Sequence, residues 1–296
     1  MDGLVRRAAG VPDGVRPVHG DLLVPDGLPR GPYDGICHLA ALTRVRESFD
    51  APLRYFTANV QGTVNLLEAV DADRVVLGST AAVYGTPERQ PIPESEPAAP
   101  ASPYGASKLA AEQAVRFHAR TGAIGAVVLR TFNVAGSVDG RVDPDETRLI
   151  PKALAVAAGR APHLDVNGDG LAVREYLHVD DLAAAYVRAV EAVAPGEDRV
   201  YNVGSGAGAA VREVVAAVEE VTGRPVPTRS RARPARGAGA GLRRHRDPYR
   251  PRLAAGPLRP AGDHRRCVER PGPRGRINSP ACPSRSSKSR CCTTGS

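Results

Sequence analysis

Short apolar runs alternate with longer helical patterns from residue 18 to about residue 223, and this alternation limits the fold more than any other feature of the chain. Residues 74–77 and 126–129 are typical of strands buried on both faces, and residues 35–40 indicate a third strand. This order predicts an α/β fold with a parallel sheet. The helices expected between and after these strands cover residues 53–70, 105–121, 149–159, 180–193 and 210–222.

Local signals mark where some of these elements begin and end. Asp180 is expected to cap the helix of residues 180–193, and Gly223 to end the last helix. The six prolines of residues 87–103 predict a loop that crosses the surface. No run approaches the roughly 18 apolar residues that span a bilayer, so no membrane association is expected.

Charge divides the chain at about residue 228. The net charge of the whole chain is +8, but residues 229–296 hold 17 Arg, 1 Lys and 3 acidic residues, a net of +15, which leaves residues 1–228 at −7. Apolar periodicity stops in the basic segment, so we expect a disordered tail there. Cys37 is the one cysteine of the body. A single body cysteine suits a reducing compartment, and the expected location is the cytoplasm.

Tyr104 and Lys108 lie four residues apart near the start of an expected helix. Side chains at this spacing share one face of a helix. A free tyrosine titrates near pH ~10, and a nearby cation stabilises its phenolate, so the pair is suited to act as a proton-transferring base near neutral pH. The pair alone also fits an exposed helix with an unrelated Tyr and Lys. The surrounding motifs decide between the two interpretations.

Two longer segments, Gly78-Ser-Thr-Ala-Ala-Val-Tyr-Gly85 and Ser102-Pro-Tyr-Gly-Ala-Ser-Lys-Leu109, follow one another in the sequence. In this order they resemble the extended short-chain dehydrogenase/reductases, and most closely the NAD-dependent epimerase/dehydratase family with its UDP-glucose 4-epimerases. The resemblance runs from about residue 15 to residue 228. Further matching segments are Gly20-Asp-Leu22, His38-Leu-Ala-Ala41, Glu47-Ser48, Asn59-Val-Gln-Gly-Thr63, Leu129-Arg-Thr-Phe-Asn133, Arg174-Glu-Tyr-Leu-His-Val-Asp-Asp181 and Tyr201-Asn-Val-Gly-Ser-Gly206.

The resemblance implies a Rossmann-like parallel sheet and a division into three parts. Residues 1–135 would form a partial NAD-binding domain with the catalytic Tyr and Lys, and residues 136–228 a small substrate-binding α/β region interleaved with it. Residues 229–296 would be the disordered tail, interpreted either as out-of-frame translation or as a basic arm for nucleic acid. The family's first strand, glycine-rich phosphate loop and helix are expected to be missing, because Gly20-Asp21 already matches its third strand.

Carried over residue by residue, the resemblance assigns the catalytic roles to Thr80, Tyr104 and Lys108. Tyr104 would be the base and acid for a sugar hydroxyl, and Thr80 would hold the same oxygen. Lys108 would lower the pKa of Tyr104 and bind the nicotinamide ribose. The implied reaction is oxidation of a UDP- or dTDP-hexose at C4, followed by return of the hydride to the other face of the sugar.

NAD is the expected cofactor, and no metal site is expected. Small residues at Ala40 and Ala41 suit the close approach of backbone to a flat ligand. A guanidinium at Arg174 suits a diphosphate, with a surface ion pair as its alternative. His38 and His178 are interpreted as packing or hydrogen-bonding residues. The expected cofactor contacts are Asp21, Leu22, Leu39, Ala40, Ala41, Asn59, Tyr104, Lys108 and Phe132, and the expected substrate contacts are Thr80, Tyr104, Asn133 and Arg174.

The residues after Thr80 bear on the type of reaction. Family members that eliminate water carry an acidic residue there, whereas Ala81 and Ala82 carry no proton, so the resemblance favours 4-epimerisation over dehydration. Thr43 and Thr131 depart from the family's pattern and leave the sugar open. The alternatives are a catalytically impaired remnant of such an enzyme, a nucleotide-sugar dehydratase and, less favoured, a nucleic-acid-binding protein that uses its basic tail. A homodimer is compatible with the sequence but is not specified by it.

Overall fold

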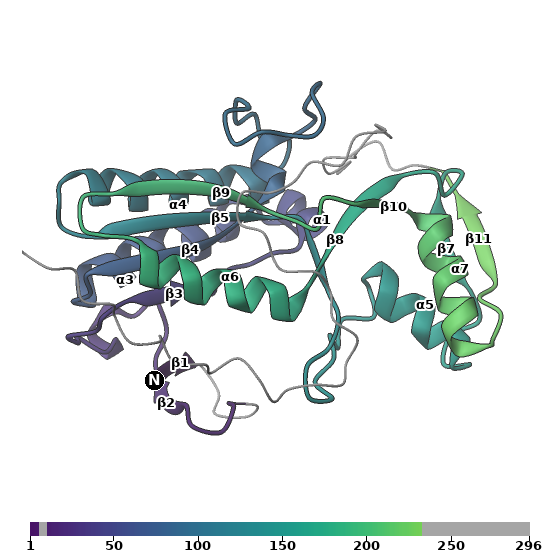
Figure 1. Cartoon of the computed structure of the whole chain (residues 1–296), viewed down its shortest axis with the longest axis horizontal. Coiled ribbons are helices and arrows are strands. Elements are labelled where there is room, and N and C mark those ends of the chain that lie inside the picture. Colours follow the sequence, from purple (N-terminus) through teal and green to yellow (C-terminus); the bar gives the residue numbers. More distant parts are fainter. Residues whose placement is uncertain (6–10, 233–296) are drawn as a thin grey trace, which may run out of the picture. The chain divides into compact units, whose positions relative to one another are not determined.

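The main sheet is parallel and has the strand order β3-β4-β5-β9 (Figure 1). The computed structural model describes residues 1–5 and 11–232, all within the compact unit Met1–Ala255. Because the strands are parallel, their carboxyl ends meet at one edge, which is where ligands bind in open α/β sheets. The four strands are β3 (Ile36–His38), β4 (Arg74–Thr80), β5 (Gly125–Thr131) and β9 (Asp198–Val203).

Helices cover both faces of this sheet. α4 (Pro103–Arg120) packs on one face and α6 (Val179–Ala192) on the other. Side chains of β4 alternate between them, with Val75 and Leu77 buried against α4 and Val76 against α6. Burial on both faces explains why these strands are apolar throughout, and it confirms the α/β class with a parallel sheet.

Both covering helices begin at a side-chain cap. The Ser102 hydroxyl accepts a hydrogen bond from the Gly105 N–H at 3.1 Å, and Pro103 follows it at the first helical position. The expected Asp180 cap of α6 is wrong, because the helix begins one residue earlier and His178 Nδ1 accepts from the Asp180 N–H at 3.2 Å. The Asp180 carboxylate instead lies in the first turn, where the helix dipole favours a negative charge.

The segment expected as one helix at residues 53–70 is helical in three pieces. α2 (Pro52–Phe56) leads into a π-helical turn, η2 (Thr57–Gln61), and then into α3 (Gly62–Ala69). A short helix, α1 (Val45–Asp50), precedes them. Isolated π turns occur often at functional sites, and this one carries Asn59.

Two short parallel strands near the N-terminus, β1 (Asp2–Val5) and β2 (Arg16–His19), form a separate sheet. β1 is not expected from the sequence, because its residues form no apolar run. Polar contacts fix it instead: the Asp2 carboxylate accepts hydrogen bonds from Arg16 Nε at 2.9 Å and from the Tyr33 phenol at 2.9 Å.

The rest of the described chain forms two further small sheets and a core of its own. α5 (Leu149–Ala157) and α7 (Val211–Thr222) pack on one another through Ala153, Val156, Val215 and Val218. None of the described helices is long and apolar enough to cross a membrane. In one small sheet, β8 (Val173–His178) pairs antiparallel with β10 (Gly208–Ala210) and in parallel with β6 (Asn133–Ala135). In the other, β7 (Leu164–Asn167) pairs in parallel with β11 (Thr228–Arg231).

β11 corrects the expected start of the disordered tail. Residues 229–231 lie in that tail by composition, yet they form a strand paired in parallel with β7. Such pairing is possible because backbone hydrogen bonds do not depend on side-chain polarity. The Asp165 carboxylate of β7 also forms ion pairs with both arginines of β11, with Arg229 Nε at 2.8 Å and with Arg231 Nη2 at 2.8 Å. The remainder of the expected tail, residues 233–296, lies outside the described residues.

Candidate active site

Tyr104 and Thr80 meet at the carboxyl edge of the main sheet. Tyr104 lies in the first turn of α4 and Thr80 ends β4, and the Thr80 hydroxyl is near enough to the Tyr104 phenol to lower its pKa. The backbone allows this approach because residue 105 is glycine. A Cβ on Gly105 would lie 2.6 Å from the carbonyl oxygen of Ala82, well inside van der Waals contact.

The environment of the Tyr104 phenol is largely apolar. The side chain is 8% exposed, and the ring of Tyr55 stands edge-on to it with ring centres 6.4 Å apart. Burial raises the pKa of Tyr104, while the hydrogen bond from Thr80 and the charge of Arg148 act in the opposite direction. The lowering of this pKa by Lys108 stays a prediction.

Lys108 lies one helical turn beyond Tyr104 and is 2% exposed. Burial lowers the pKa of Lys108 to about 8, and the charge of Glu112 opposes that shift. His38, at the end of β3, bonds through Nε2 to the Thr63 hydroxyl at 2.9 Å. Burial first, and then the charge of Lys108, lowers the pKa of His38 to about 3. His38 is therefore a neutral hydrogen-bonding residue at physiological pH, which confirms its interpretation.

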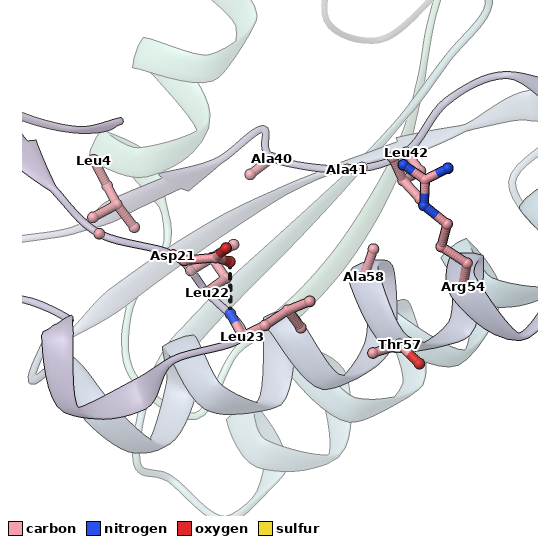
Figure 2. Close-up of a pocket in the computed structure, with 11 residues that line it drawn as sticks. Leu4, Asp21, Leu22, Leu23, Ala40, Ala41, Leu42, Arg54, Thr57 and Ala58 are labelled. Carbon is pink, nitrogen blue, oxygen red and sulfur yellow. Dashed lines mark hydrogen bonds between the residues drawn. The ribbon is translucent and has the colours of Figure 1, made fainter. Parts of the chain in front are cut away.

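A cavity of about 650 Å³ opens at the same edge of the sheet (Figure 2). Its volume is in the usual range for cofactor sites, about 300–1,000 Å³. The Asp21 carboxylate, at the end of β2, accepts a hydrogen bond from the Leu23 N–H at 3.0 Å within it. The residues that line the cavity are Leu4, Gly20, Asp21, Leu22, Leu23, Ala40, Ala41, Leu42, Arg54, Thr57 and Ala58.

These residues fit one end of a dinucleotide. The small side chains at Gly20, Ala40, Ala41 and Ala58 leave room for a flat ring against the backbone, and Asp21 offers a carboxylate to hydroxyl or amino groups. The structure thus brings together four of the expected cofactor contacts, Asp21, Leu22, Ala40 and Ala41 (Figure 2). Among the described residues, no cluster of three or more His, Cys, Asp or Glu could hold a metal ion.

Asn59 lies behind this cavity rather than in its lining. Its side-chain oxygen accepts from the Leu42 N–H at 2.8 Å, and its Nδ2 donates to the Leu42 carbonyl at 3.1 Å and to the Ser107 hydroxyl at 2.9 Å. Asn59 is 1% exposed. It therefore ties the loop after β3 to the catalytic face of α4, and a direct contact with a cofactor stays a prediction.

The remaining expected contacts lie outside the cavity lining. Leu39 is 64% exposed, and Phe132 packs against the buried group that includes Tyr84. Asn133 Nδ2 donates to the Glu175 carbonyl at 2.9 Å, and Arg174 Nη1 donates to the Val173 carbonyl at 2.8 Å. Asn133 and Arg174 therefore lie on the paired strands β6 and β8, and their contact with a substrate stays a prediction.

Several residues of this region are missed by the sequence analysis, including Leu4, Leu23 and Leu42 of the cavity lining. Arg54, Thr57 and Ala58 line the cavity from one helix face, and their spacing of three and four residues is the signal that could have found them. Arg148, whose charge acts on Tyr104, lines a second hollow of about 510 Å³ together with Arg44. Both guanidinium groups pair with Asp145, at 3.7 and 3.3 Å. No local pattern marks Arg148.

A buried Tyr and Lys and a half-buried Thr at the carboxyl edge of a parallel sheet, beside a cavity suited to a dinucleotide, define a Rossmann-type dehydrogenase-like enzyme. The chain belongs to the NAD dependent epimerase/dehydratase family, whose pattern matches residues 4–204. The expected family, its Rossmann-like fold and its cofactor NAD are thereby confirmed.

Within this family, the chain is similar to several UDP-glucose 4-epimerases. The chain is 43% identical to the UDP-glucose 4-epimerase of Streptomyces lividans over 234 residues, which are 74% of this chain and 71% of the relative. Among solved structures, it is similar to UDP-glucose 4-epimerase from Brucella ovis in complex with NAD, with a TM-score of 0.68 and 37% identity, covering 76% of this chain and 75% of the other. The enzyme from Bifidobacterium longum in complex with NAD+ and UDP gives a TM-score of 0.71 at 32% identity, covering 79% and 75%.

Proposed function

We propose that the chain is an NAD-dependent nucleotide-sugar 4-epimerase of the UDP-glucose 4-epimerase type. The observation that carries the proposal is the position of Thr80 next to Tyr104, whose pKa the Thr80 hydroxyl lowers, at the edge of the sheet beside the buried Lys108 and next to the cavity. The relatives support the reaction type, since those from Streptomyces lividans, Corynebacterium glutamicum and Brucella ovis are UDP-glucose 4-epimerases.

The proposed chemistry divides between the cofactor and the chain. NAD, when bound, supplies reversible hydride transfer at a sugar carbon. Asp21, Leu22, Ala40 and Ala41 would hold it. Tyr104 would accept the proton of the sugar C4 hydroxyl, and Thr80 would hold that oxygen through its own hydroxyl.

The proton is returned by the same group. Once the 4-keto sugar has turned over, Tyr104 would return the proton to the oxygen, and C4 would carry the opposite configuration. The charge of Lys108 would stabilise the phenolate between the two steps. Burial of this group of residues excludes water, which protects a keto intermediate and strengthens each electrostatic interaction.

The residues around Thr80 support epimerisation over elimination. Ala81, at the start of η3 (Ala81–Tyr84), is buried, and Ala82 uses its N–H to bond the Thr80 hydroxyl at 3.1 Å. Neither side chain can move a proton, and loss of water from a sugar needs an acid beside the catalytic hydroxyl residue. Asn133 and Arg174 are proposed as contacts of the nucleotide diphosphate, for which a guanidinium is well suited.

The proposal also covers the division of the chain into two parts, the substrate class and the compartment. We place the start of the substrate-binding part near residue 136 and treat it as interleaved with the NAD-binding part. The helices α5 and α7 pack on one another in a separate core, whereas α6 and β9 return to the main sheet. The substrate is a UDP- or dTDP-hexose, and the compartment is the cytoplasm. A homodimer stays a prediction.

The test measures cofactor and reaction separately. The purified chain is denatured and the released NAD is quantified by chromatography, and the native chain is incubated with UDP-galactose, UDP-glucose and dTDP-glucose. We expect bound or bindable NAD and interconversion of the C4 epimers of at least one nucleotide sugar. NAD binding with no epimerisation of any of them, or with release of water to a 4-keto-6-deoxy sugar, would overturn the proposal.

A further inference from the structure

Three buried residues of α4 follow one another at four-residue steps: Tyr104, Lys108 and Glu112. Residues at this spacing lie on one face of a helix. They are 8%, 2% and 0% exposed. Tyr104 and Lys108 have proposed roles, whereas Glu112 has none. A carboxylate this deeply buried is costly unless other groups compensate it.

Groups from both central strands bind the Glu112 carboxylate. From β4, the Ser79 hydroxyl donates a hydrogen bond to Oε1. From β5, Arg130 donates through Nε to Oε1 at 3.1 Å and through Nη2 to Oε2 at 2.7 Å. Arg130 is held in turn by the phenol of Tyr84, to which its Nη1 donates at 3.0 Å. One carboxylate thus joins α4, β4 and β5.

The position of Ser79 connects this network with the candidate active site. Ser79 directly precedes Thr80, and its carbonyl accepts a hydrogen bond from the Thr131 hydroxyl at 3.0 Å. The bond to Glu112 therefore fixes the strand end from which Thr80 reaches Tyr104. A change at Glu112 would move Thr80 and the face of α4 relative to one another.

The charges around Lys108 give Glu112 a second effect. His38 of β3 is neutral at physiological pH, because its pKa is lowered to about 3. Tyr55 of α2 and Tyr186 of α6 are neutral phenols, since burial raises the pKa of each. Arg130 of β5 is a cation. Within the described part of the chain, Glu112 is the carboxylate whose charge acts on Lys108.

We propose that Glu112 is a positioning residue for the catalytic face of α4: its carboxylate keeps Lys108 in the charged form and, through Ser79, holds the strand end that presents Thr80 to Tyr104. The roles of Lys108 and Thr80 in this statement rest on the proposed function. The direction agrees with the electrostatics, because the Glu112 charge raises the pKa of Lys108 against the effect of burial. A neutral Lys108 would leave the Tyr104 phenolate without its cation.

The titration of Lys108 tests the proposal directly. The chain contains three lysines, Lys108, Lys152 and Lys288, so a protein labelled with ¹³C at lysine Cε gives a spectrum simple enough to assign by substitution. The titration is measured without NAD or sugar. We expect Lys108 to titrate near pH 8 in the unaltered chain. In Glu112→Gln, which keeps the shape and loses the charge, the midpoint should fall by about one pH unit or more.

Conservative and matched variants separate charge from structure. Glu112→Asp keeps the charge, so its Lys108 midpoint should lie close to that of the unaltered chain. Ser79→Ala removes a neutral hydrogen-bond donor and should leave the Lys108 midpoint unchanged. Glu191→Gln, which removes an exposed carboxylate from α6, is the matched control and should also leave it unchanged. An unchanged Lys108 midpoint in a folded Glu112→Gln chain would overturn the proposal.

A folding defect would not end the test. Removing one partner of a buried ion pair is strongly destabilising, whereas replacing both is often tolerated. The double variant Glu112→Gln/Arg130→Met should therefore fold, which circular dichroism checks, and should show a fall of the midpoint in the same direction, reduced by the loss of the Arg130 cation. Failure of both variants to fold would assign Glu112 a structural role alone and overturn the proposal. Because the titration of Lys108 is measured without NAD or sugar, its outcome does not depend on catalytic activity. An inactive chain would therefore contradict the proposed function and leave the titration result as it is.

Discussion

Gly105 lies directly against the carbonyl of Ala82, and this backbone contact is what brings the first turn of α4 to the end of β4. A methyl group at residue 105 would lie 2.6 Å from the Ala82 oxygen. Rotation of a side chain could not relieve this contact, because the Ala82 atom involved is a backbone oxygen.

Gly105→Ala should therefore destabilise the fold and separate Tyr104 from Thr80. Forcing an extra methyl group into a packed contact typically costs about 1–3 kcal/mol, and urea unfolding would measure it. Gly27→Ala is the control, because a Cβ at Gly27 meets nothing within 4 Å. Equal stability of the two variants would show that the contact is not restrictive.

Tyr104→Phe should abolish most of the proposed epimerisation and leave the fold intact. Loss of a positioned acid/base group typically lowers the rate by about 10²- to 10⁴-fold, and the measurement is the turnover of UDP-galactose. Tyr33→Phe removes a phenol that bonds Asp2 outside the site and should retain the rate. An unaltered rate in Tyr104→Phe would remove Tyr104 from the mechanism.

Lys108→Met should stabilise the chain at pH 7 while it removes activity. Burial lowers the pKa of Lys108 from 10.5 to about 8, so the charged form is disfavoured in the folded state. The gain in the free energy of unfolding at pH 7 is up to about 3 kcal/mol, because a tenfold change in an acid dissociation constant corresponds to about 1.4 kcal/mol.

The pH dependence of that gain has a definite sign. Between pH 8 and 10.5 the unfolded chain binds more protons at Lys108 than the folded chain does, so the unaltered protein gains stability as the pH rises. The advantage of Lys108→Met should shrink across this window in denaturant titrations. Lys152→Met, on α5, is the control, expected to change stability by no more than about 0.5 kcal/mol. A destabilised Lys108→Met chain at pH 7 would show that the charge is well compensated.

The pairing of β11 with β7 should weaken in acid. A hydrogen bond from Arg229, together with the charges of Arg229 and Arg231, holds the pKa of Asp165 below its ordinary value of 3.8. The stabilisation that the Asp165 carboxylate contributes to the pairing is therefore fully present above pH 3.8 and is lost as the pH falls through the lowered value. Amide exchange of β11 should speed up in Asp165→Asn at pH 7, whereas Asp169→Asn, in the turn after β7, should leave it slow. Unchanged exchange in Asp165→Asn would show that backbone pairing alone holds the strand.

The parts of the fold that follow from the sequence are those that apolar burial determines. β4 and β5 are predictable because both faces are covered, which requires apolar residues throughout. β1 and β11 are not, because Asp2 and Asp165 hold them by ion pairs whose partners are distant or ambiguous in sequence.

The candidate site divides in the same way. Tyr104 and Lys108 are found by their spacing on one helix, and Thr80 by its motif. Glu112 shares that spacing, but its function depends on Arg130 and Ser79, which only the packed sheet brings to it. Arg148 is likewise found only through its position near Tyr104 in the folded chain.

The three hydrogen bonds of Asn59 make the loop after β3 and the first turns of α4 one thermodynamic unit. A ligand that orders the loop at Ala40–Leu42 must therefore also restrict Ser107 and the helix around it. If a sugar binds against Tyr104 as proposed, the reciprocity of coupled equilibria requires it to change the affinity for the dinucleotide by the same factor as the dinucleotide changes the affinity for the sugar.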